Sequence, residues 1–290
     1  MKKKLLAFIV CISVSFYIFA MSWPVREGRL EANFGVNDQG IPLLGNFFAA
    51  SGSVFPSDVG NLIFVHDPEN PASRFASPLG AWMAIDHGDN LIGLYARYEE
   101  RRDAQVPTLV EPGTVLSSTG SSGWSEQHGV YFAIFDRSER HWVNPSVLII
   151  GTVSGVEDTT PPVFRQVELR SRAGTSYNPA QTQRLTQGLY GVYVDIYDTI
   201  EPGGSLLAPN RITCFVNGVE TGILSFETLL SREGKRMVYQ AGTVPASQVY
   251  DERSFCLGEI HLPRGQVTLY IEGRDMADNA RSVTYRLTIE

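Results

Sequence analysis

Short hydrophobic runs bounded by glycine, proline, asparagine or aspartate recur along residues 23–290. In the first half of the chain they cover residues 61–65, 81–85, 91–95, 130–135 and 147–150. In the second half they cover residues 189–197, 211–216, 266–272 and 282–290, with apolar and polar positions alternating over 189–197. Runs of this length, separated by turn residues, are typical of β-strands. The pattern predicts an all-β fold, with one short helix candidate at residues 225–232.

A polar segment ending in Pro161-Pro162 divides the strand pattern into two parts. Two consecutive prolines continue neither a helix nor a central strand, so residues 154–162 are predicted to be a linker. It separates a domain at 23–153 from a second at 163–290. The second contains about seven short strands and the turn Asn217-Gly218, a strong hairpin signal. This spacing favours an immunoglobulin-like β-sandwich.

The N-terminus has the form of a secretory signal peptide. Three lysines at positions 2–4 precede an apolar run over residues 5–20, and Ala20-Met21-Ser22 offers a small-x-small cleavage site. Residues 1–22 are therefore predicted to direct export to the periplasm or cell envelope. The alternative is an uncleaved segment that anchors the protein in the membrane, although the run is slightly short for a span. No other segment is apolar and long enough to span a membrane.

The net charge and the cysteine content bear on the protein's partners and on its covalent cross-links. The formal net charge is −7, and it becomes −10 when the three N-terminal lysines leave with the signal peptide. This acidity argues against a nucleic-acid partner. Cys214 and Cys256 would remain in the exported chain. Two cysteines in an exported protein predict one disulfide, and two buried thiols are the alternative.

The chain has no compact catalytic motif. Its five histidines form neither an H-x-H nor an H-E-x-x-H pattern, and the chain has no G-x-S-x-G elbow and no P-loop. A zinc site needs three or four converging N, S or O ligands, so any such site would have to be built from distant residues.

Residues 34–150 nevertheless resemble the lysostaphin/LytM-type peptidoglycan metallopeptidase domain. The resemblance lies in the order and spacing of several short motifs. They are Phe34-Gly35 with Gly40-Ile41, Ala49-Ala50-Ser51-Gly52-Ser53-Val54, Ile85-Asp86-His87-Gly88-Asp89-Asn90, Leu94-Tyr95-Ala96-Arg97-Tyr98, Val110-Glu111-Pro112-Gly113 with Ser118-Thr119-Gly120-Ser121-Ser122-Gly123, Gly129-Val130-Tyr131-Phe132, and Val143-Asn144-Pro145. The resemblance implies a compact β domain of the LytM, or duplicated-hybrid-motif, type.

The residues that serve catalysis in that family are replaced here. The resemblance places Asp38, Pro42 and Tyr131 at the three zinc-ligand positions, and Arg97 and Gly129 at the two catalytic histidines. Proline and glycine offer no ligating or proton-transferring side chain, and an arginine stays protonated. Without a metal no bound water is activated. The resemblance therefore implies a non-catalytic member with no zinc cofactor.

A surviving active-site groove would be a binding surface for peptidoglycan, or a docking site for a cell-wall hydrolase that this protein regulates or scaffolds. Its candidate residues are Asp38, His87, Arg97, Trp124, His128 and Tyr131. Arginine pairs with carboxylates and the aromatic rings offer stacking area. His87 is interpreted first as a structural hydrogen-bonding residue, and His128 as a solvated loop residue. Two alternatives stay open: an active zinc endopeptidase with Asp38, His87 and His128 as rearranged ligands, and a structural or adhesive surface protein.

The second domain offers one candidate site. The sequence Asp275-Met276-Ala277-Asp278-Asn279 resembles a turn of bacterial immunoglobulin-like domains. It is interpreted as an Asx-type turn. The alternative is a calcium site formed by Asp275, Asp278 and Asn279, because calcium takes clustered oxygen ligands.

Overall fold

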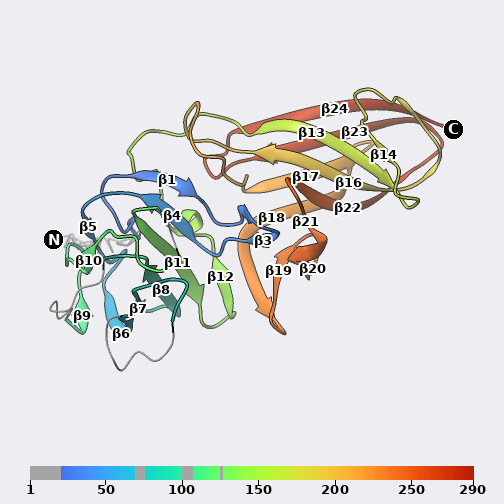
Figure 1. Cartoon of the computed structure of the whole chain (residues 1–290). Coiled ribbons are helices and arrows are strands. Elements are labelled where there is room, and N and C mark those ends of the chain that lie inside the picture. Colours follow the sequence, from blue (N-terminus) through green and yellow to red (C-terminus); the bar gives the residue numbers. More distant parts are fainter. Residues whose placement is uncertain (1–20, 69–75, 100–106, 125–126) are drawn as a thin grey trace, which may run out of the picture.

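The computed structural model describes residues 21–68, 76–99, 107–124 and 127–290 (Figure 1). Nearly all of its regular elements are β-strands, which confirms the predicted all-β class. The apolar run at residues 5–20 lies outside the described residues. Within the described ranges, no helix is long and apolar enough to cross a membrane.

We call residues 23–153 the first domain and residues 163–290 the second domain. The first domain contains antiparallel strands in the order β12-β11-β8-β7-β6-β9, with β4 pairing with β11 and β1 with β4. Two small antiparallel pairs, β2 with β3 and β5 with β10, form separate two-stranded sheets. The elements are β1 (Arg29–Ala32), β2 (Asn37–Asp38), β3 (Ile41–Pro42), β4 (Asn46–Ala49), β5 (Ser53–Val54), β6 (Gly60–His66), β7 (Trp82–Asp86), β8 (Leu91–Ala96), β9 (Leu109–Val110), β10 (Ser117–Ser118), β11 (Val130–Asp136), β12 (His141–Val143) and α1 (Pro145–Leu148).

Strand alternation gives this sheet two different faces. On one face Tyr95 and Phe132 are fully buried in the main core of the domain. On the other face, the residues next to them in sequence join a smaller apolar cluster that includes Ala96 and Tyr131. Because side chains of successive strand residues point to opposite faces, the two clusters belong to the same strands but lie on opposite sides of the sheet.

The second domain is a sandwich of two sheets around one core. One sheet has the order β14-β13-β16-β22-β21, and the other contains β15-β24-β23-β17-β18 with the β19 and β20 pair at its edge. The elements are β13 (Val163–Ser171), β14 (Ser176–Tyr177), β15 (Arg184–Leu185), β16 (Gly188–Tyr197), β17 (Arg211–Val216), β18 (Val219–Arg232), β19 (Lys235–Tyr239), β20 (Thr243–Pro245), a 3₁₀ turn (Ala246–Gln248), β21 (Tyr250–Asp251), β22 (Ser254–Leu262), β23 (Gly265–Arg274) and β24 (Ala280–Ile289). Asn217 and Gly218, both at positive φ, form the expected turn between β17 and β18.

The two domains share a sheet and part of a core. Strand β12 pairs with β18, which makes one continuous sheet across the boundary (Figure 1). Phe34 extends from the first domain into the core of the second, where it is fully buried. The Tyr250 hydroxyl donates a hydrogen bond of 2.5 Å to the Gly35 carbonyl beside it. The first domain is therefore held on the second by main-chain pairing and by an inserted aromatic ring.

Two local predictions are wrong. The helix expected at residues 225–232 is the second half of strand β18, where Leu224, Phe226 and Leu229 are all fully buried. A register shift between Ser225 and Leu229 interrupts the alternation of buried and exposed positions. This interruption gives the apolar residues of the stretch a helix-like spacing. The strand expected at residues 147–150 overlaps helix α1, with Pro145 in its first turn and the Asn144 side chain accepting from the Ser146 amide.

The disulfide between Cys214 and Cys256 is not formed, and both residues are free cysteines. Cys214 is buried in the core of the sandwich, where burial raises the pKa of its thiol to about 11. Cys256 lies between the buried Phe255 and Leu257 on β22, so it points to the outer face, opposite Tyr193. The two thiols thus lie on different sheets and different faces, and two-residue periodicity explains why they do not meet.

Candidate functional site

Two residues that the resemblance places at active-site positions, Arg97 and Tyr131, lie together on one face of the first domain's sheet. Tyr131 on β11 lies beside Phe47 on β4 and beside Ala96 on β8. Arg97 follows Ala96 directly and lies over both rings, its Cζ 5.5 Å from the centroid of Phe47 and 5.7 Å from that of Tyr131. We call Phe47, Ala96, Arg97 and Tyr131 the Arg97 face.

Arg97 is held in an uncommon backbone conformation. Its φ is 65°, in the left-handed region, and its amide donates to the carbonyls of Leu79 (3.0 Å) and Ala81 (2.9 Å). The Nε atom is buried and has no hydrogen-bond partner. Within the described residues the guanidinium makes no ion pair, and the faces of the two rings attract it through cation–π contacts.

Tyr131 is buried, and burial raises the pKa of its hydroxyl far above the ordinary value. Leu44 donates a backbone hydrogen bond to this hydroxyl, and the charges of Arg97 and Arg236 act on it as well. Arg236 comes from β19 of the second domain and donates to the Pro42 carbonyl. The second domain therefore contributes a second cation to the neighbourhood of the Arg97 face.

The resemblance places Gly129 at the other catalytic position, and the backbone leaves no room for a side chain there. A Cβ at Gly129 would lie 2.0 Å from the Phe48 carbonyl oxygen and 3.0 Å from the Phe47 ring. Carbon and oxygen atoms not bonded to each other do not approach this closely. A histidine at this position would require β4 and β11 to move apart.

The ligand positions that the resemblance assigns do not fit a zinc ion. Pro42 is buried without a ligating group, Tyr131 is a buried phenol, and Asp38 is exposed on the β2–β3 hairpin. Zinc takes four ligands in tetrahedral geometry, usually from histidine, cysteine or a carboxylate. One carboxylate with a buried phenol does not supply that set.

His87 lies in a hydrogen-bond network on the other side of the sheet. Its Nδ1 lies 3.0 Å from the Val59 carbonyl, and its Nε2 lies 3.0 Å from the hydroxyl of Tyr95. Tyr95 in turn accepts from the Ser57 amide at 2.7 Å and is buried in the main core, opposite Tyr131. A neutral imidazole donates to the carbonyl with one nitrogen and accepts from the phenol with the other.

This network predicts acid sensitivity. Burial lowers the pKa of His87, so the unfolded chain binds more protons below about pH 6.5. The stability that the neutral ring contributes is present above that pH and is lost as the pH falls. We expect the unfolding free energy in urea to drop between pH 7.5 and 5, and to drop less in His87→Gln. His261→Gln, at an exposed position, serves as the control and should drop like the wild type; an equal drop in His87→Gln would contradict the assignment.

The remaining candidates do not join the Arg97 face. The His128 ring lies 3.1 Å from the Thr119 hydroxyl and 3.4 Å from that of Ser121, in an exposed loop. Trp124 is 80% exposed. The rearranged ligand set of Asp38, His87 and His128 does not come together: among the described residues, the single cluster of three metal-ligating side chains is Asp158, Asp198 and Asp275.

Sequence reasoning missed three features of this region. Phe47 fills the face under Arg97, Arg236 reaches it from the second domain, and the Asp cluster forms at the domain junction. The motif spacing of the first domain contains no signal for Arg236 or for the Asp cluster, because both depend on how the two domains meet.

The comparisons with known proteins concern both domains. A protein-family model matches residues 161–290. No curated protein matches the chain.

Similar solved structures include lysostaphin from Staphylococcus simulans, with 13% identity over 93% of this chain and 91% of that chain and a TM-score of 0.37. The catalytic domain of the prophage-encoded M23 protein EnpA from Enterococcus faecalis has 24% identity over 41% of this chain and 88% of that chain, with a TM-score of 0.34. A putative peptidase M23 from Pseudomonas aeruginosa has 18% identity over 45% and 50%, with a TM-score of 0.33. The chain is thus similar, at low identity, to structures of M23-type peptidases and of lysostaphin.

Proposed function

We propose that this protein is a non-catalytic module of the cell envelope that binds peptidoglycan through the Arg97 face. The observation that carries the proposal is the state of Arg97 at a position where the resemblance expects a catalytic histidine. Arg97 is a half-buried cation, and no acidic side chain among the described residues pairs with it. An arginine with free donors pairs well with a carboxylate, and peptidoglycan stem peptides carry several. Export through residues 1–22 is part of this proposal.

The absence of catalysis is proposed on the same residues. Arg97 holds its proton and cannot act as a base, and Gly129 has no side chain and no space for one. The Tyr131 hydroxyl is already bound to the Leu44 amide. These three groups offer neither a general base nor a ligand for a water-activating metal.

The second domain is proposed to be immunoglobulin-like and to serve as a rigid support for the first. The sheet β13-β16-β22 facing the sheet β24-β23-β17 agrees with that arrangement. The shared β12–β18 pairing and the buried Phe34 support a fixed relation between the domains.

Co-sedimentation with purified peptidoglycan sacculi tests the proposal. We expect the wild type to be retained without releasing soluble peptides, and Arg97→Ala to be retained about tenfold less, since a charge-assisted hydrogen bond contributes about 1.5–3 kcal/mol. Arg172→Ala is the matched control: this exposed arginine pairs with Glu259 on the second domain, so its removal should leave retention unchanged. Release of peptides, or equal retention of both variants, would contradict the proposal. A protein that is not retained but changes the rate of a cell-wall hydrolase would point to the hydrolase as the partner.

A further inference from the structure

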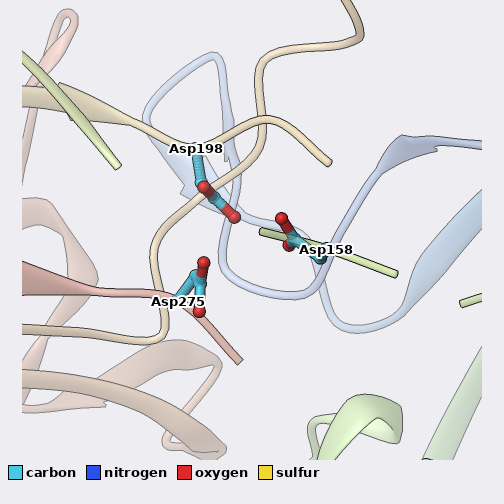
Figure 2. Close-up of side chains that lie close together, drawn as sticks. All are labelled: Asp158, Asp198 and Asp275. Atoms are coloured by element: carbon cyan, nitrogen blue, oxygen red, sulfur yellow. The ribbon is translucent and has the colours of Figure 1, made fainter. Parts of the chain in front are cut away.

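Three aspartates from separate parts of the chain converge at the junction of the two domains. Asp158 lies in the segment between α1 and β13, Asp198 directly follows β16, and Asp275 directly follows β23. Figure 2 shows their carboxylates pointing toward one another, and one oxygen of each lies within 4.8 Å of those of the other two. Asp198 and Asp275 are only 5% and 2% exposed.

Two of these carboxylates are oriented by neutral donors. Asp275 Oδ1 accepts from the amides of Ala277 (2.8 Å) and Asn279 (2.9 Å), and its Oδ2 accepts from the Asn279 side chain at 2.8 Å. The same Asn279 amide group donates to the Asp158 carbonyl at 3.0 Å, and Asp158 Oδ1 accepts from the Thr160 amide. Within the described residues none of the three aspartates forms an ion pair, so no arginine or lysine balances the cluster.

Asp198 gives an independent indication of a ligand. Its Oδ1 is buried and has no hydrogen-bond partner, and its carboxylate points toward the other two aspartates (Figure 2). The backbone holds it there, because Asp198 and Leu207 exchange hydrogen bonds of 2.8 and 2.9 Å. Burial and the neighbouring carboxylates raise the pKa of Asp198 to about 8. An unpartnered carboxylate oxygen at such a site is costly unless a proton, a water molecule or a cation binds it.

We propose that a calcium ion binds between Asp158, Asp198 and Asp275. The three side chains supply only oxygen ligands, which suit a hard cation and not the nitrogen and sulfur chemistry of zinc. Asp158 and Asp198 also line an interdomain cavity of about 560 Å³, which leaves space for the water molecules that complete calcium coordination. The ion would join the linker residue Asp158 to two strand ends of the second domain, and so fix the linker where the domains meet.

This site differs from the one considered on the sequence. Asp278 does not take part: its side chain is 86% exposed and faces Arg274 at 3.4 Å. Asn279 acts as a donor to two of the aspartates, so its side-chain nitrogen faces them. Asp275 does form the predicted Asx-type turn, and its carboxylate belongs to both the turn and the cluster. Asp278 is therefore a matched control, an aspartate in the same turn but outside the cluster.

Calcium binding and thermal unfolding of the purified chain test the proposal. After treatment with EDTA, equilibrium dialysis against calcium should give one bound ion per wild-type chain, and calcium at about a hundred times the Kd should raise Tm by about 5–10 °C. Sodium chloride at equal ionic strength should not reproduce the increase. Asp198→Asn should abolish both effects, while Asp278→Asn should retain them. No bound calcium in the wild type, or equal binding and an equal Tm increase in Asp198→Asn, would overturn the proposal.

Discussion

Truncating Phe34 to alanine is expected to lower the unfolding free energy by about 3–5 kcal/mol, since the ring is fully buried and leaves a cavity in a packed core. The cavity would form in the second domain, although Phe34 belongs to the first. Phe226 belongs to the same core and approaches the neighbouring Gly35: a Cβ at Gly35 would lie 2.7 Å from Phe226 Cδ1. The Phe34 amide is fixed as well, donating to the Asn46 side chain at 2.9 Å.

Urea unfolding followed by circular dichroism and by tryptophan fluorescence measures this loss and its cooperativity. Phe64→Ala is the control. The Phe64 ring on β6 is 48% exposed, and its centroid lies 4.7 Å from that of the tilted Trp82 ring. Loss of the Phe64 ring should therefore lower the unfolding free energy by about 1 kcal/mol. Wild-type unfolding should be a single transition in both probes, because the shared sheet and the inserted ring couple the domains. A loss below about 1 kcal/mol in Phe34→Ala would contradict the inserted-ring packing.

Gly129→Ala is expected to destabilise the protein by at least about 2 kcal/mol, because the new methyl group would meet the Phe48 carbonyl oxygen. Gly129 does not have a positive φ, so the cost comes from steric contact and not from backbone conformation. Its amide and carbonyl are both bonded to Gly120, at 2.7 and 2.9 Å, which limits how far the strand can shift. The same contact would oppose any attempt to restore a histidine at this position.

Gly188→Ala provides the comparison. It lies at the start of β16, has no positive φ, and its added Cβ would come no closer than 3.8 Å to a neighbouring atom. That substitution should be neutral or stabilise by up to about 1 kcal/mol, through the less flexible unfolded chain. Equal stabilities of the two variants in urea would show that the β4–β11 spacing is wider than described here.

The pattern of neighbouring hydrophobic and polar residues predicts most strands. It does not predict contacts between residues that are far apart in the sequence. Alternation predicts β16, and Asn217-Gly218 predicts the hairpin between β17 and β18, because both signals depend on neighbouring residues alone. Strand β18 was missed because a bulge shifts its buried positions from a spacing of two to a spacing of three. Helix α1 could have been found, since Asn144 and Pro145 are a standard cap and first-turn pair.

The sequence likewise predicts some residues of the candidate site and not others. The motif order places Arg97 and Tyr131 near each other, and the structure brings them within cation–π distance. The position of His87 on the opposite side follows from its bond to Tyr95, one residue before Ala96 on the same strand. Arg236 comes from the other domain, so no spacing within the first domain predicts its place. The aspartate cluster likewise requires three segments that only the folded chain brings together.

Metal content tests the central claim most directly. The protein, produced without a histidine tag, would be dialysed against zinc in the presence of excess calcium, and the bound zinc measured per chain. We predict zinc close to background, because Asp38, Pro42 and Tyr131 do not form a ligand set and Gly129 has no side chain. Zinc near one ion per chain that persists in excess calcium would contradict this account, because it would show a zinc site built from ligands other than those of the family pattern.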